Sequence, residues 1–522
     1  MGALEEVLKL WDENRALIQE GYTALDKVLV LGLPATSMPP ESEEKNSGIG
    51  SPYGAGAERI WRFWHNVIHK IMLGPLGKTE AATWHSPYLA SWDYNPFFID
   101  LEWLNKQKLI SVLDIKKIYA YPKRDGYIDF KQVEKDYMNV LQKAWKKSKT
   151  QKSFTQFCND LVRKQIERSA FTYITDIPVN IPRRISDRHP DWFLKDFSLG
   201  APPDQYSPKP QKWGFPLLNP NALFSSNAQQ PLGPAGRVFK RLLEFYLRGN
   251  KGGTRIDHFI GWVDPYCFYT GKKRYKNGRL YSSPRHPLLK NFYLRNKNDF
   301  LRMTAEFLMP LSKKFHLSSM DIYPEDLGIR PTAMDHVLRT FHLGKMLPAQ
   351  FNEPDNPNHM YHFANALPED MVVIDTHDNP SMLDFFKNLS PEKRELFARE
   401  LAVDLRFNYT QDLCDPSWLY RMQWGAALAS PARRVIVFFT SLMGQEGRYN
   451  TPGVLDSWHL RCRTHFEKEY FLALKQGKAY NPFEAICFAI YARGDDFYRT
   501  HEDLVRRLGQ AEEVFFQALQ NL

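Results

Sequence analysis

Met371-Val372-Val373-Ile374, followed directly by Asp375-Thr376-His377-Asp378-Asn379, is the stretch of this 522-residue chain that decides the fold class. Its apolar residues run continuously and do not alternate with polar ones. Such a run is typical of a strand that is buried on both faces of a parallel sheet. The acidic residues would then lie where the strand ends. The stretch therefore predicts an α/β fold with functional groups at the carboxyl end of a parallel strand.

Two further acidic motifs have the same arrangement. Asp257 lies in Arg255-Ile256-Asp257-His258-Phe259, after a glycine-rich turn, and Glu325 begins Glu325-Asp326-Leu327-Gly328 after the apolar pair Ile322-Tyr323. In (β/α)8 barrels the catalytic groups lie at the carboxyl ends of several strands and face one site. The three motifs together predict one acidic site that is built from three strand ends.

The rest of the chain alternates between candidate strands and helical segments, which favours a (β/α)8 TIM barrel over a sandwich. We expect residues 1–47 to be an N-terminal extension of helix and loop, and residues 48–522 to be the catalytic barrel. Segments at about 100–168 and 178–250 are too long for simple connections and are expected as inserted subdomains. An amphipathic pattern at about 500–520 predicts a closing helix. The expected strands are 70–73, 172–177, 254–257, 321–323, 371–374 and 435–439.

Composition argues against several classes of protein. The formal net charge is +10, but it is spread along the chain, and the lysine cluster at 143–152 is expected to be a solvated helix face, so no nucleic acid partner is predicted. No stretch approaches the roughly 18 apolar residues of a membrane span, and the N-terminus lacks a signal-peptide pattern. The five cysteines show neither a CxxC pair nor metal-ligand spacing. These features favour a cytoplasmic protein without membrane contact.

The ordered motifs resemble those of the amylomaltases, the 4-alpha-glucanotransferases also called disproportionating enzymes. The resemblance covers roughly residues 48–461. Before the acidic motifs it includes Ser86-Pro87-Tyr88, Asp176-Ile177-Pro178, Pro202-Pro203-Asp204 and Trp213-Gly214-Phe215-Pro216, and after them Arg448-Tyr449-Asn450. It implies a retaining, glycosidase-like enzyme on a (β/α)8 barrel that transfers α-1,4-glucan segments between maltodextrin or glycogen-derived chains.

The resemblance also implies roles for the three carboxylates. The nucleophile falls on Asp257, the acid/base on Glu325 and the transition-state stabiliser on Asp378. A retaining transfer passes through a covalent glycosyl-enzyme, so one carboxyl group attacks while another protonates the leaving oxygen. Asp257 must then be ionised, which the fixed charge of Arg255 would favour, whereas Glu325 must hold a proton near neutral pH.

A second set of residues is expected to bind the sugar chains. Aromatic side chains can stack on glucose rings and exclude water, and polar ones can hold hydroxyl groups. Each candidate also has a plain structural alternative, such as a core histidine, a packed tryptophan or a structural ion pair. The resemblance implies a glucan donor and acceptor, no metal or organic cofactor, and a monomer or homodimer. The candidates are Arg255, His377, Tyr88, Trp213, Asp204, His258 and Asn450, with Tyr206 as a further aromatic residue of the insertions.

Several positions depart from the family's usual sequence. Ile260 replaces a common arginine, Phe215 replaces an asparagine after Trp-Gly, and Pro380 replaces an aspartate after Thr-His-Asp-Asn. None of these changes removes a catalytic carboxylate, but isoleucine and phenylalanine cannot hydrogen-bond to sugar hydroxyls. The preferred glucan length is therefore open. Two alternatives to transfer also stay open, an α-1,4-glucan hydrolase and a catalytically weak glucan-binding protein.

Overall fold

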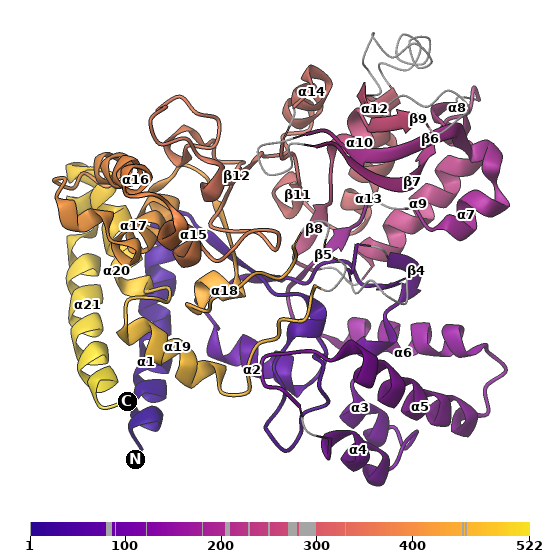
Figure 1. Ribbon diagram of the computed structural model, residues 1–522, viewed down its shortest axis with the longest axis horizontal. Coiled ribbons are helices and arrows are strands. Elements are labelled where there is room, and N and C mark those ends of the chain that lie inside the picture. The colour runs from indigo at the N-terminus through magenta and orange to yellow at the C-terminus, as the bar shows by residue number, and fades with distance from the viewer. Residues whose placement is uncertain are drawn as a thin grey trace. The chain divides into compact units, whose positions relative to one another are not determined.

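In the computed structural model, the chain folds into two compact units. The helices and strands are labelled in Figure 1. The first unit comprises Met1–Leu73, Pro96–Thr172 and Leu347–Leu522, and the second comprises Gly74–Asn95 and Tyr173–Met346. Each unit is thus assembled from segments that are far apart in the sequence. The structure describes residues 2–79, 86–88, 90–121, 123–179, 181–203, 209–227, 230–248, 251–269, 279–280, 299–328, 330–451, 454 and 457–522.

The first unit contains the parallel strands β2-β1-β14-β13, which are neighbours in this order within an eight-stranded sheet. In β1, Val30 lies opposite Ile436 of β14 and Lys70 of β2, and in β13, Val372 lies opposite Val435 of β14. All five residues of β14 and all three of β13 are buried, as continuous apolar runs require. The strands are β1 (Val28–Gly32), β2 (Lys70–Met72), β13 (Met371–Val373) and β14 (Arg434–Phe438).

Strand β1 differs from the expectation for residues 1–47. We expected only helix and loop there, whereas residues 28–32 form a strand that pairs on both sides. Its sequence, Val28-Leu29-Val30-Leu31, has the same continuous apolar pattern as residues 371–374, but it is followed directly by a proline-rich stretch that is typical of loops. The six strands that we did expect all form, with ends within one residue of the expected positions.

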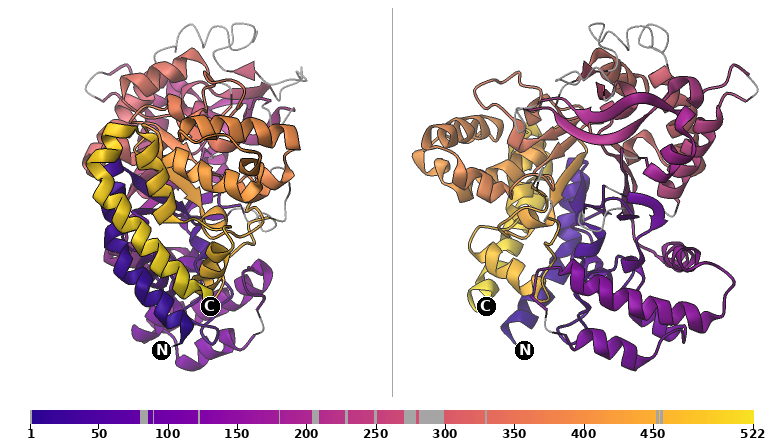
Figure 2. Two further views of the ribbon diagram at one scale, coloured as in Figure 1. Left: turned by 90° about the vertical axis from the view of Figure 1, so that its left-hand side faces the viewer. Right: turned by 45° about the vertical axis from the view of Figure 1, so that its right-hand side comes forward.

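Helices α1 and α21 of the first unit lie side by side, as Figure 2 shows in indigo and yellow. Arg507 of α21 donates to Glu20 of α1, with Nη1 and Oε2 3.0 Å apart. Trp11 of α1 lies within 5.5 Å of the Phe63 ring and 6.0 Å of the Phe515 ring, between ring centroids, and its indole N–H donates to the Phe63 carbonyl. Buried aromatic contacts of this kind are among the largest contributions to a core. The closing helix expected at about 500–520 is therefore α21.

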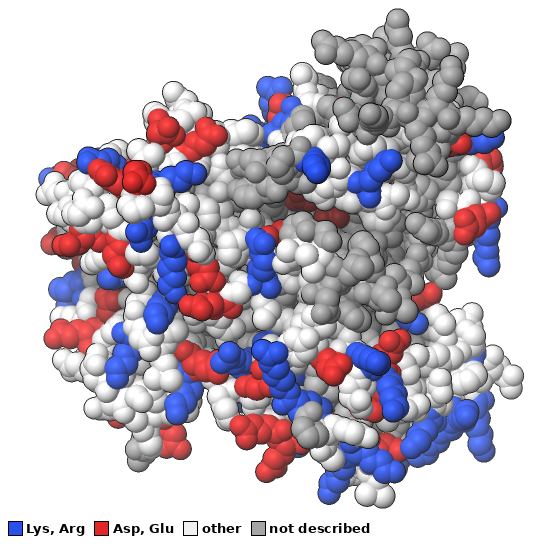
Figure 3. Space-filling view, in the orientation of Figure 1, with Lys and Arg blue, Asp and Glu red and all other residues white. Residues whose placement is uncertain are grey.

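The segment at about 100–168 is helical. Its lysine cluster lies on and just after α5, and Figure 3 shows the basic side chains in blue at the lower right, over that helix. Lys143 has 58% of its side chain exposed and pairs with Asp114 at 2.8 Å, which confirms a solvated helix face. The helices of the first unit are α1 (Ala3–Leu25), α2 (Ala55–Phe63), α3 (Leu101–Lys106), α4 (Val112–Tyr119), α5 (Phe130–Ser148), α6 (Phe154–Arg168), α15 (Met382–Asn388), α16 (Pro391–Asp404), α17 (Pro416–Ala429), α18 (Phe439–Leu442), α19 (Phe466–Lys475), α20 (Pro482–Ala492) and α21 (Asp495–Gln520).

The second unit contains the parallel strands β11-β8-β5 and a separate antiparallel sheet in the order β10-β9-β6-β7. The antiparallel strands β6 and β7 lie within the segment expected as an insertion at 178–250. The strands of this unit are β3 (Gly77–Thr79), β4 (Ala90–Tyr94), β5 (Tyr173–Ile177), β6 (Phe193–Ala201), β7 (Gln211–Leu218), β8 (Gly253–Ile256), β9 (Tyr266–Tyr269), β10 (Arg279–Leu280) and β11 (Ile322–Pro324). Its helices are α7 (Arg183–Arg188), α8 (Pro220–Leu223), α9 (Pro234–Leu247), α10 (Ile260–Val263), α12 (Asp299–Met303), a π-helical turn (Thr304–Leu308), α13 (Met309–Lys314) and α14 (Thr332–Thr340).

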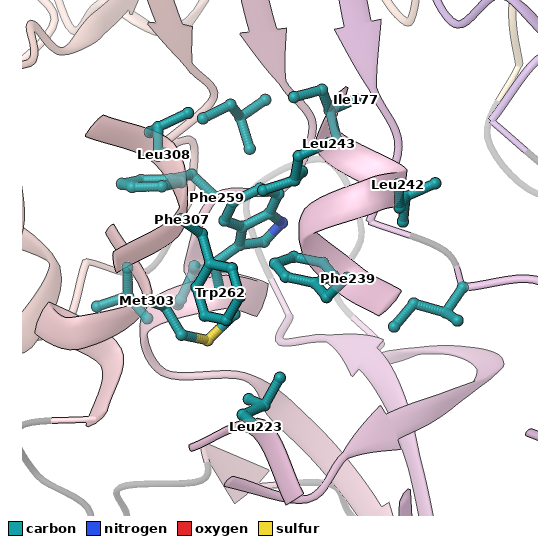
Figure 4. Close-up of a cluster of buried hydrophobic side chains, with 14 of the residues drawn as sticks. Ile177, Leu223, Phe239, Leu242, Leu243, Phe259, Trp262, Met303, Phe307 and Leu308 are labelled. Atoms are coloured by element: carbon teal, nitrogen blue, oxygen red, sulfur yellow. The ribbon is translucent and has the colours of Figure 1, made fainter. Parts of the chain in front are cut away.

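An apolar cluster packs the helices of the second unit around the turn that follows β8 (Figure 4). Phe239 of α9 contacts Trp262 at 5.1 Å and Phe307 at 5.3 Å between ring centroids. Phe259 is fully buried, and Ile260 is only 2% exposed. The residues directly after Asp257 are thus held in the core. The departure from arginine at position 260 falls in an apolar environment, where an unpaired charge would be costly.

Eight strands run along the chain in the order β1, β2, β5, β8, β11, β12 (Met346–Pro348), β13 and β14. Among the described residues, α-helices follow every one of these strands except β12. The described connection from β12 to β13 contains only 3₁₀ turns. This is the element pattern of a (β/α)8 barrel, and the expected α/β class is confirmed. No described helix is both long and apolar enough to cross a membrane.

Candidate active site

Strands β5, β8 and β11 bring three acidic side chains together in the second unit. The register places Asp176 of β5 opposite Arg255 of β8. Asp257 and Glu325 directly follow β8 and β11, and the backbone amide of Glu325 donates to the carbonyl of Ile256 at 2.9 Å. Because residues two apart on a strand point to the same side, Arg255 and Asp257 share one face. The positions of these carboxylates are therefore set by the sheet itself.

Arg255 is the centre of this group. Its Nη1 lies 3.2 Å from Asp257 Oδ1, and its Nη2 lies 3.3 Å from Glu325 Oε2. The same guanidinium forms an ion pair with Asp176, and only 8% of the arginine side chain is exposed. A planar guanidinium presents several donors in a fixed geometry, so it can hold more than one carboxylate at once. Arg255 thus bridges the two carboxylates to which the family resemblance assigns the roles of nucleophile and acid/base.

The turn after β8 supplies a further donor to Glu325. His258 has a φ of 45°, a left-handed conformation that is uncommon outside glycine, and its backbone N–H donates to Glu325 Oε2 at 2.8 Å. The imidazole is buried and meets the Trp213 ring edge to face, with centroids 4.6 Å apart. Burial lowers the pKa of His258 to about 3, so the ring is neutral at ordinary pH. His258 therefore acts on Glu325 through its backbone.

Burial and charge oppose each other at Asp257. Removal from water raises its pKa well above the ordinary value, the charge of Arg255 acts against this rise, and the charge of Glu325 adds to it. Burial likewise raises the pKa of Asp176. We expected Arg255 to keep Asp257 ionised, but desolvation outweighs the arginine. Three carboxylates surround a single guanidinium, so the group would carry excess negative charge if all three were ionised. The group therefore favours retention of a proton, which is shared among the coupled acids.

Asp176 is a member of the group that the sequence analysis did not single out as functional. It is fully buried, and Tyr88 donates its phenol O–H to Asp176 Oδ2 at 2.8 Å. Arg255 Nη1 also lies 3.2 Å from the Tyr88 oxygen. The available signal was its place at the end of the buried strand Tyr173–Ile177, the same pattern that identified the three acidic motifs. Asp176 orients both Arg255 and Tyr88.

Asp378 lies in the first unit, after β13, with two other predicted residues. Asn450 donates its side-chain N–H to Asp378 Oδ1 at 2.6 Å, and His377 Nε2 lies 3.4 Å from Asp378 Oδ2. Asp378 has 44% of its side chain exposed, while His377 is buried with its ring 5.3 Å from that of Trp458. Ser457 holds the Asn450 side chain in place by donating to its Oδ1 at 3.0 Å. The three predicted residues thus form one group with an accessible carboxylate.

Asp375 anchors the loop that carries this group. Its carboxylate accepts the Phe438 backbone N–H at 2.8 Å and the Ser441 hydroxyl at 2.7 Å, which ties the end of β13 to the end of β14. The side chain is fully buried, and burial raises the pKa of Asp375 to about 7. Thr376 closes the loop by donating to the Asn379 side chain at 2.5 Å. Asp378 is therefore presented from a rigid turn.

A family model described as 4-alpha-glucanotransferase matches residues 160–466, more than half of the chain. The chain belongs to the 4-alpha-glucanotransferase family. The match contains β5, β8, β11 and β13, and with them all the acidic residues described above.

Individual 4-alpha-glucanotransferases are distant relatives. The enzyme of Thermus thermophilus is 25% identical over 308 residues, which cover 56% of this chain and 54% of that one. The enzyme of Clostridium butyricum is 23% identical over 497 residues, which cover 80% of this chain and 93% of that one. This chain spans about half the length of several curated relatives that it matches, such as the Thermus and Chlamydia trachomatis enzymes.

Solved amylomaltases share the fold. The amylomaltase of Streptococcus agalactiae, in complex with acarbose, superimposes with a TM-score of 0.66 at 17% identity and covers 90% of this chain and 100% of its own. The amylomaltase of Corynebacterium glutamicum gives a TM-score of 0.63 at 14% identity, covering 91% of this chain and 77% of its own. The likeness to these amylomaltases confirms the expected (β/α)8 barrel.

The 4-alpha-glucanotransferase motifs thus form two groups. The second unit brings together Arg255, Asp257, Glu325, Tyr88, His258 and Trp213, and the first unit brings together His377, Asp378 and Asn450. Two predicted contact residues, Asp204 and Tyr206, lie outside the described residues. Of the departures, Phe215 packs near Trp213 with centroids 6.0 Å apart, and the Pro380 carbonyl accepts from Gln350 at 2.8 Å.

Asp176→Asn is expected to lower the turnover number about 10- to 100-fold and to change KM little. The substitution removes one charged hydrogen bond of Arg255, worth about 1.5–3 kcal/mol, and each 1.4 kcal/mol of barrier is about tenfold in rate. Initial rates of glucan transfer across a range of pH would measure it, and the pH profile should shift because one acid has left a coupled group. Tyr88→Phe, which removes one hydroxyl, should cost less. An unchanged rate and profile for Asp176→Asn would exclude the positioning role.

Proposed function

We propose that this protein is a 4-alpha-glucanotransferase that moves α-1,4-glucan segments between maltodextrin or glycogen-derived chains by a retaining double displacement. The observation that carries the proposal is the bridge from one guanidinium, that of Arg255, to both Asp257 and Glu325 at adjacent strand ends. Retaining enzymes use two carboxyl groups about 5 Å apart, and the reach of one guanidinium is compatible with that separation. Membership of the family supports the same reaction.

In the first step of the proposed reaction, Asp257 attacks the anomeric carbon of the donor glucan. The bond from that carbon to the 4-oxygen of the next glucose breaks, and Glu325 gives its proton to the departing oxygen. A covalent glycosyl ester on Asp257 results. In the second step the 4-hydroxyl of an acceptor glucan attacks the same carbon, its proton passes to Glu325, and Asp257 is released. Asp378 is proposed to stabilise the positive charge of both transition states, as its motif implies.

Two features of the second unit support this division of labour. Three carboxylates around one guanidinium favour retention of a proton, which the first step needs. The backbone N–H of His258 and the guanidinium both donate to Glu325 Oε2, so neither of these two donors engages the second oxygen of the carboxyl group. Attack by Asp257 requires its ionised form. The charge of Arg255 favours that form, although burial has the larger effect and raises the pKa of Asp257.

The remaining predicted residues complete the proposal as contacts to glucose units. Tyr88, held by Asp176, and the partly exposed Trp213 supply aromatic surface, and Asn450 and His377 supply hydrogen bonds beside Asp378. Such aromatic surfaces exclude water and favour a sugar acceptor over hydrolysis. Asp204 is proposed as a further polar contact. A cytoplasmic location, where glycogen-derived chains occur, belongs to the same proposal.

Incubation with maltotriose alone tests transfer directly. We expect glucose and maltodextrins longer than maltotriose to form while the number of reducing ends stays constant, because each transfer breaks one glycosidic bond and forms another. Product lengths resolved by chromatography, together with a reducing-end assay, would measure this. A steady rise in reducing ends would instead show the α-1,4-glucan hydrolase. Unchanged maltotriose and unchanged longer maltodextrins would leave only a glucan-binding protein.

A further inference from the structure

Three side chains of metal-binding type converge in the first unit, and neither of the groups described above includes them. Glu400 and Asp404 are four residues apart on α16, so they lie on the same face of that helix. His362, from the segment between β12 and β13, lies with its Nε2 2.9 Å from Asp404 Oδ2 and 3.8 Å from Glu400 Oε2. One imidazole and two carboxylates therefore meet from two different segments.

The spacing of the three atoms fits one small metal ion. The imidazole nitrogen and the two carboxylate oxygens all lie within 4.8 Å of one another. In a tetrahedral zinc site with bonds of about 2.0–2.1 Å, ligand atoms are about 3.3 Å apart. The distances of 2.9 Å and 3.8 Å from His362 to the two carboxylates lie on either side of that value. Only small side-chain adjustments would be needed to bind the ion.

The other nitrogen of His362 is oriented as in a metal-binding histidine. Nδ1 lies 3.1 Å from the carbonyl oxygen of Pro357 and can only donate to it. A neutral imidazole with its proton on Nδ1 keeps a lone pair on Nε2, and a backbone carbonyl is a usual partner that fixes this tautomer in metal sites. The ring is buried, which holds its orientation. His362 thus presents Nε2 to the two carboxylates.

Glu400 provides a second, independent observation in favour of a cation site. Only 7% of its side chain is exposed. Its Oε1 accepts a hydrogen bond from Asn352 at 2.6 Å, whereas the buried Oε2, which faces His362, has no hydrogen-bond donor among the described residues. The Asn352 side-chain oxygen is also buried without a donor there. Buried acceptors are normally satisfied, and two such oxygens beside a second carboxylate favour a positive ion.

We propose that His362, Glu400 and Asp404 bind one divalent transition-metal ion of the zinc class, with water completing the coordination. Imidazole together with carboxylates suits zinc, whereas magnesium and calcium prefer oxygen ligands alone. The ion would join the segment at 352–365 to α16, so its role is structural and separate from the proposed glucan transfer. Without the ion, a protonated His362 forms ion pairs with both carboxylates. The experiment must distinguish this ion-pair arrangement from a bound metal ion.

Metal content of the full-length protein tests this proposal without any activity assay. The protein is stripped with a chelator, dialysed against Zn²⁺ and then against metal-free buffer, and its zinc is counted by elemental analysis. We expect one zinc per chain and a higher midpoint of thermal unfolding with zinc than without it. Replacement of zinc by Co²⁺ should give visible absorption of a nitrogen and oxygen site, with no band from cobalt bound to cysteine.

Matched variants decide whether the ion occupies this site. His362→Gln and Glu400→Gln are expected to weaken zinc binding by about 100-fold or more, since loss of a ligand exceeds the 10- to 100-fold cost of losing a supporting contact. The controls are His359→Gln from the same segment and Glu395→Gln from the same helix, where Glu395 pairs with Arg399 on the exposed face. Both should keep one zinc per chain.

Several results would overturn the proposal. These are wild-type protein that retains no zinc, equal zinc in His362→Gln, or a cobalt band from cysteine. Because a carboxylate change alone could unfold the segment, melting of each variant in chelator is compared with that of the stripped wild type. A variant that unfolds at the same temperature as the stripped wild type and yet binds no zinc has lost the metal site and not the fold. Asp404→Asn provides a second carboxylate change on the same terms.

Discussion

Asp257→Asn will abolish glucan transfer, with a rate lower by at least about 10⁴-fold. An amide cannot attack the anomeric carbon to form the glycosyl ester, so the covalent step is lost while the shape of the side chain is kept. Initial rates of maltotriose disproportionation would measure the effect. Intact mass after addition of a maltosyl fluoride would show a glycosyl adduct on the wild-type protein and none on the variant.

The control for this variant is a carboxylate of the same unit outside the acidic group. Asp335 lies in the first turn of α14 and is not part of the group around Arg255, so Asp335→Asn should leave the transfer rate within about twofold of wild type. If Asp257→Asn retained more than a hundredth of the wild-type rate, Asp257 would not be the nucleophile. The assignment would then have to move to another carboxylate of the group.

The stability of Asp257→Asn separates lost chemistry from lost folding. Burial raises the folded-state pKa of Asp257, so the folded protein binds this proton more tightly than the unfolded chain does. For such an acid, stability falls as pH rises from its unfolded pKa, about 3.9, towards its folded pKa. Asparagine removes that loss, so the variant should unfold no more easily than wild type at pH 7. Its advantage should shrink as the pH approaches 4, which thermal unfolding at several pH values would show.

Glu325→Gln is expected to slow both steps of the reaction, by about 10²- to 10⁴-fold with maltotriose. Glutamine can neither protonate the leaving oxygen nor accept the proton of the incoming 4-hydroxyl. A maltosyl fluoride should still react in the first step, because fluoride leaves without a proton. The glycosyl-enzyme should then accumulate, and its mass should persist for longer than in the wild-type protein.

Azide provides a rescue experiment for this second variant. It is a nucleophile that needs no general base, so it should release the glycosyl group from Glu325→Gln as an α-glycosyl azide and raise the overall rate with the fluoride. The wild-type rate should change little. If Glu325→Gln used the fluoride no faster than maltotriose, relative to wild type, Glu325 would not be the general acid.

Local patterns in the sequence predicted most of the barrel strands and the acidic motifs at their ends, and the family resemblance assigned the proposed catalytic roles within those motifs. A buried strand and the acidic residue after it are contiguous, so Met371-Val372-Val373-Ile374 and its two counterparts could be recognised without knowledge of their neighbours. Strand β1 has an equally clear apolar run, but its place between β2 and β14 depends on residues 434–438 at the other end of the chain. A proline-rich stretch beside it favoured the loop assignment.

Local sequence patterns did not predict the contacts within the acidic group around Arg255. Asp176 contacts Arg255 and Tyr88, which lie 79 and 88 positions away in the sequence. The backbone N–H of His258 reaches Glu325 only because β8 and β11 pair, and no side-chain pattern reports a backbone donor. The rise in the Asp257 pKa comes from burial under the surrounding chain, which the adjacent Arg255 alone did not predict.

By itself, then, the sequence determined which stretches of this 4-alpha-glucanotransferase family member form strands and which acidic residues follow them, because hydrophobic periodicity is a property of contiguous residues. Only the tertiary structure decided which distant side chains share a proton, a guanidinium or an ion. In the trio of His362, Glu400 and Asp404, the two carboxylates are four residues apart on one helix, but His362 lies 38 and 42 positions before them in the sequence. Charge, desolvation and metal coordination act through space, so they appear only once separate segments of the chain are packed together.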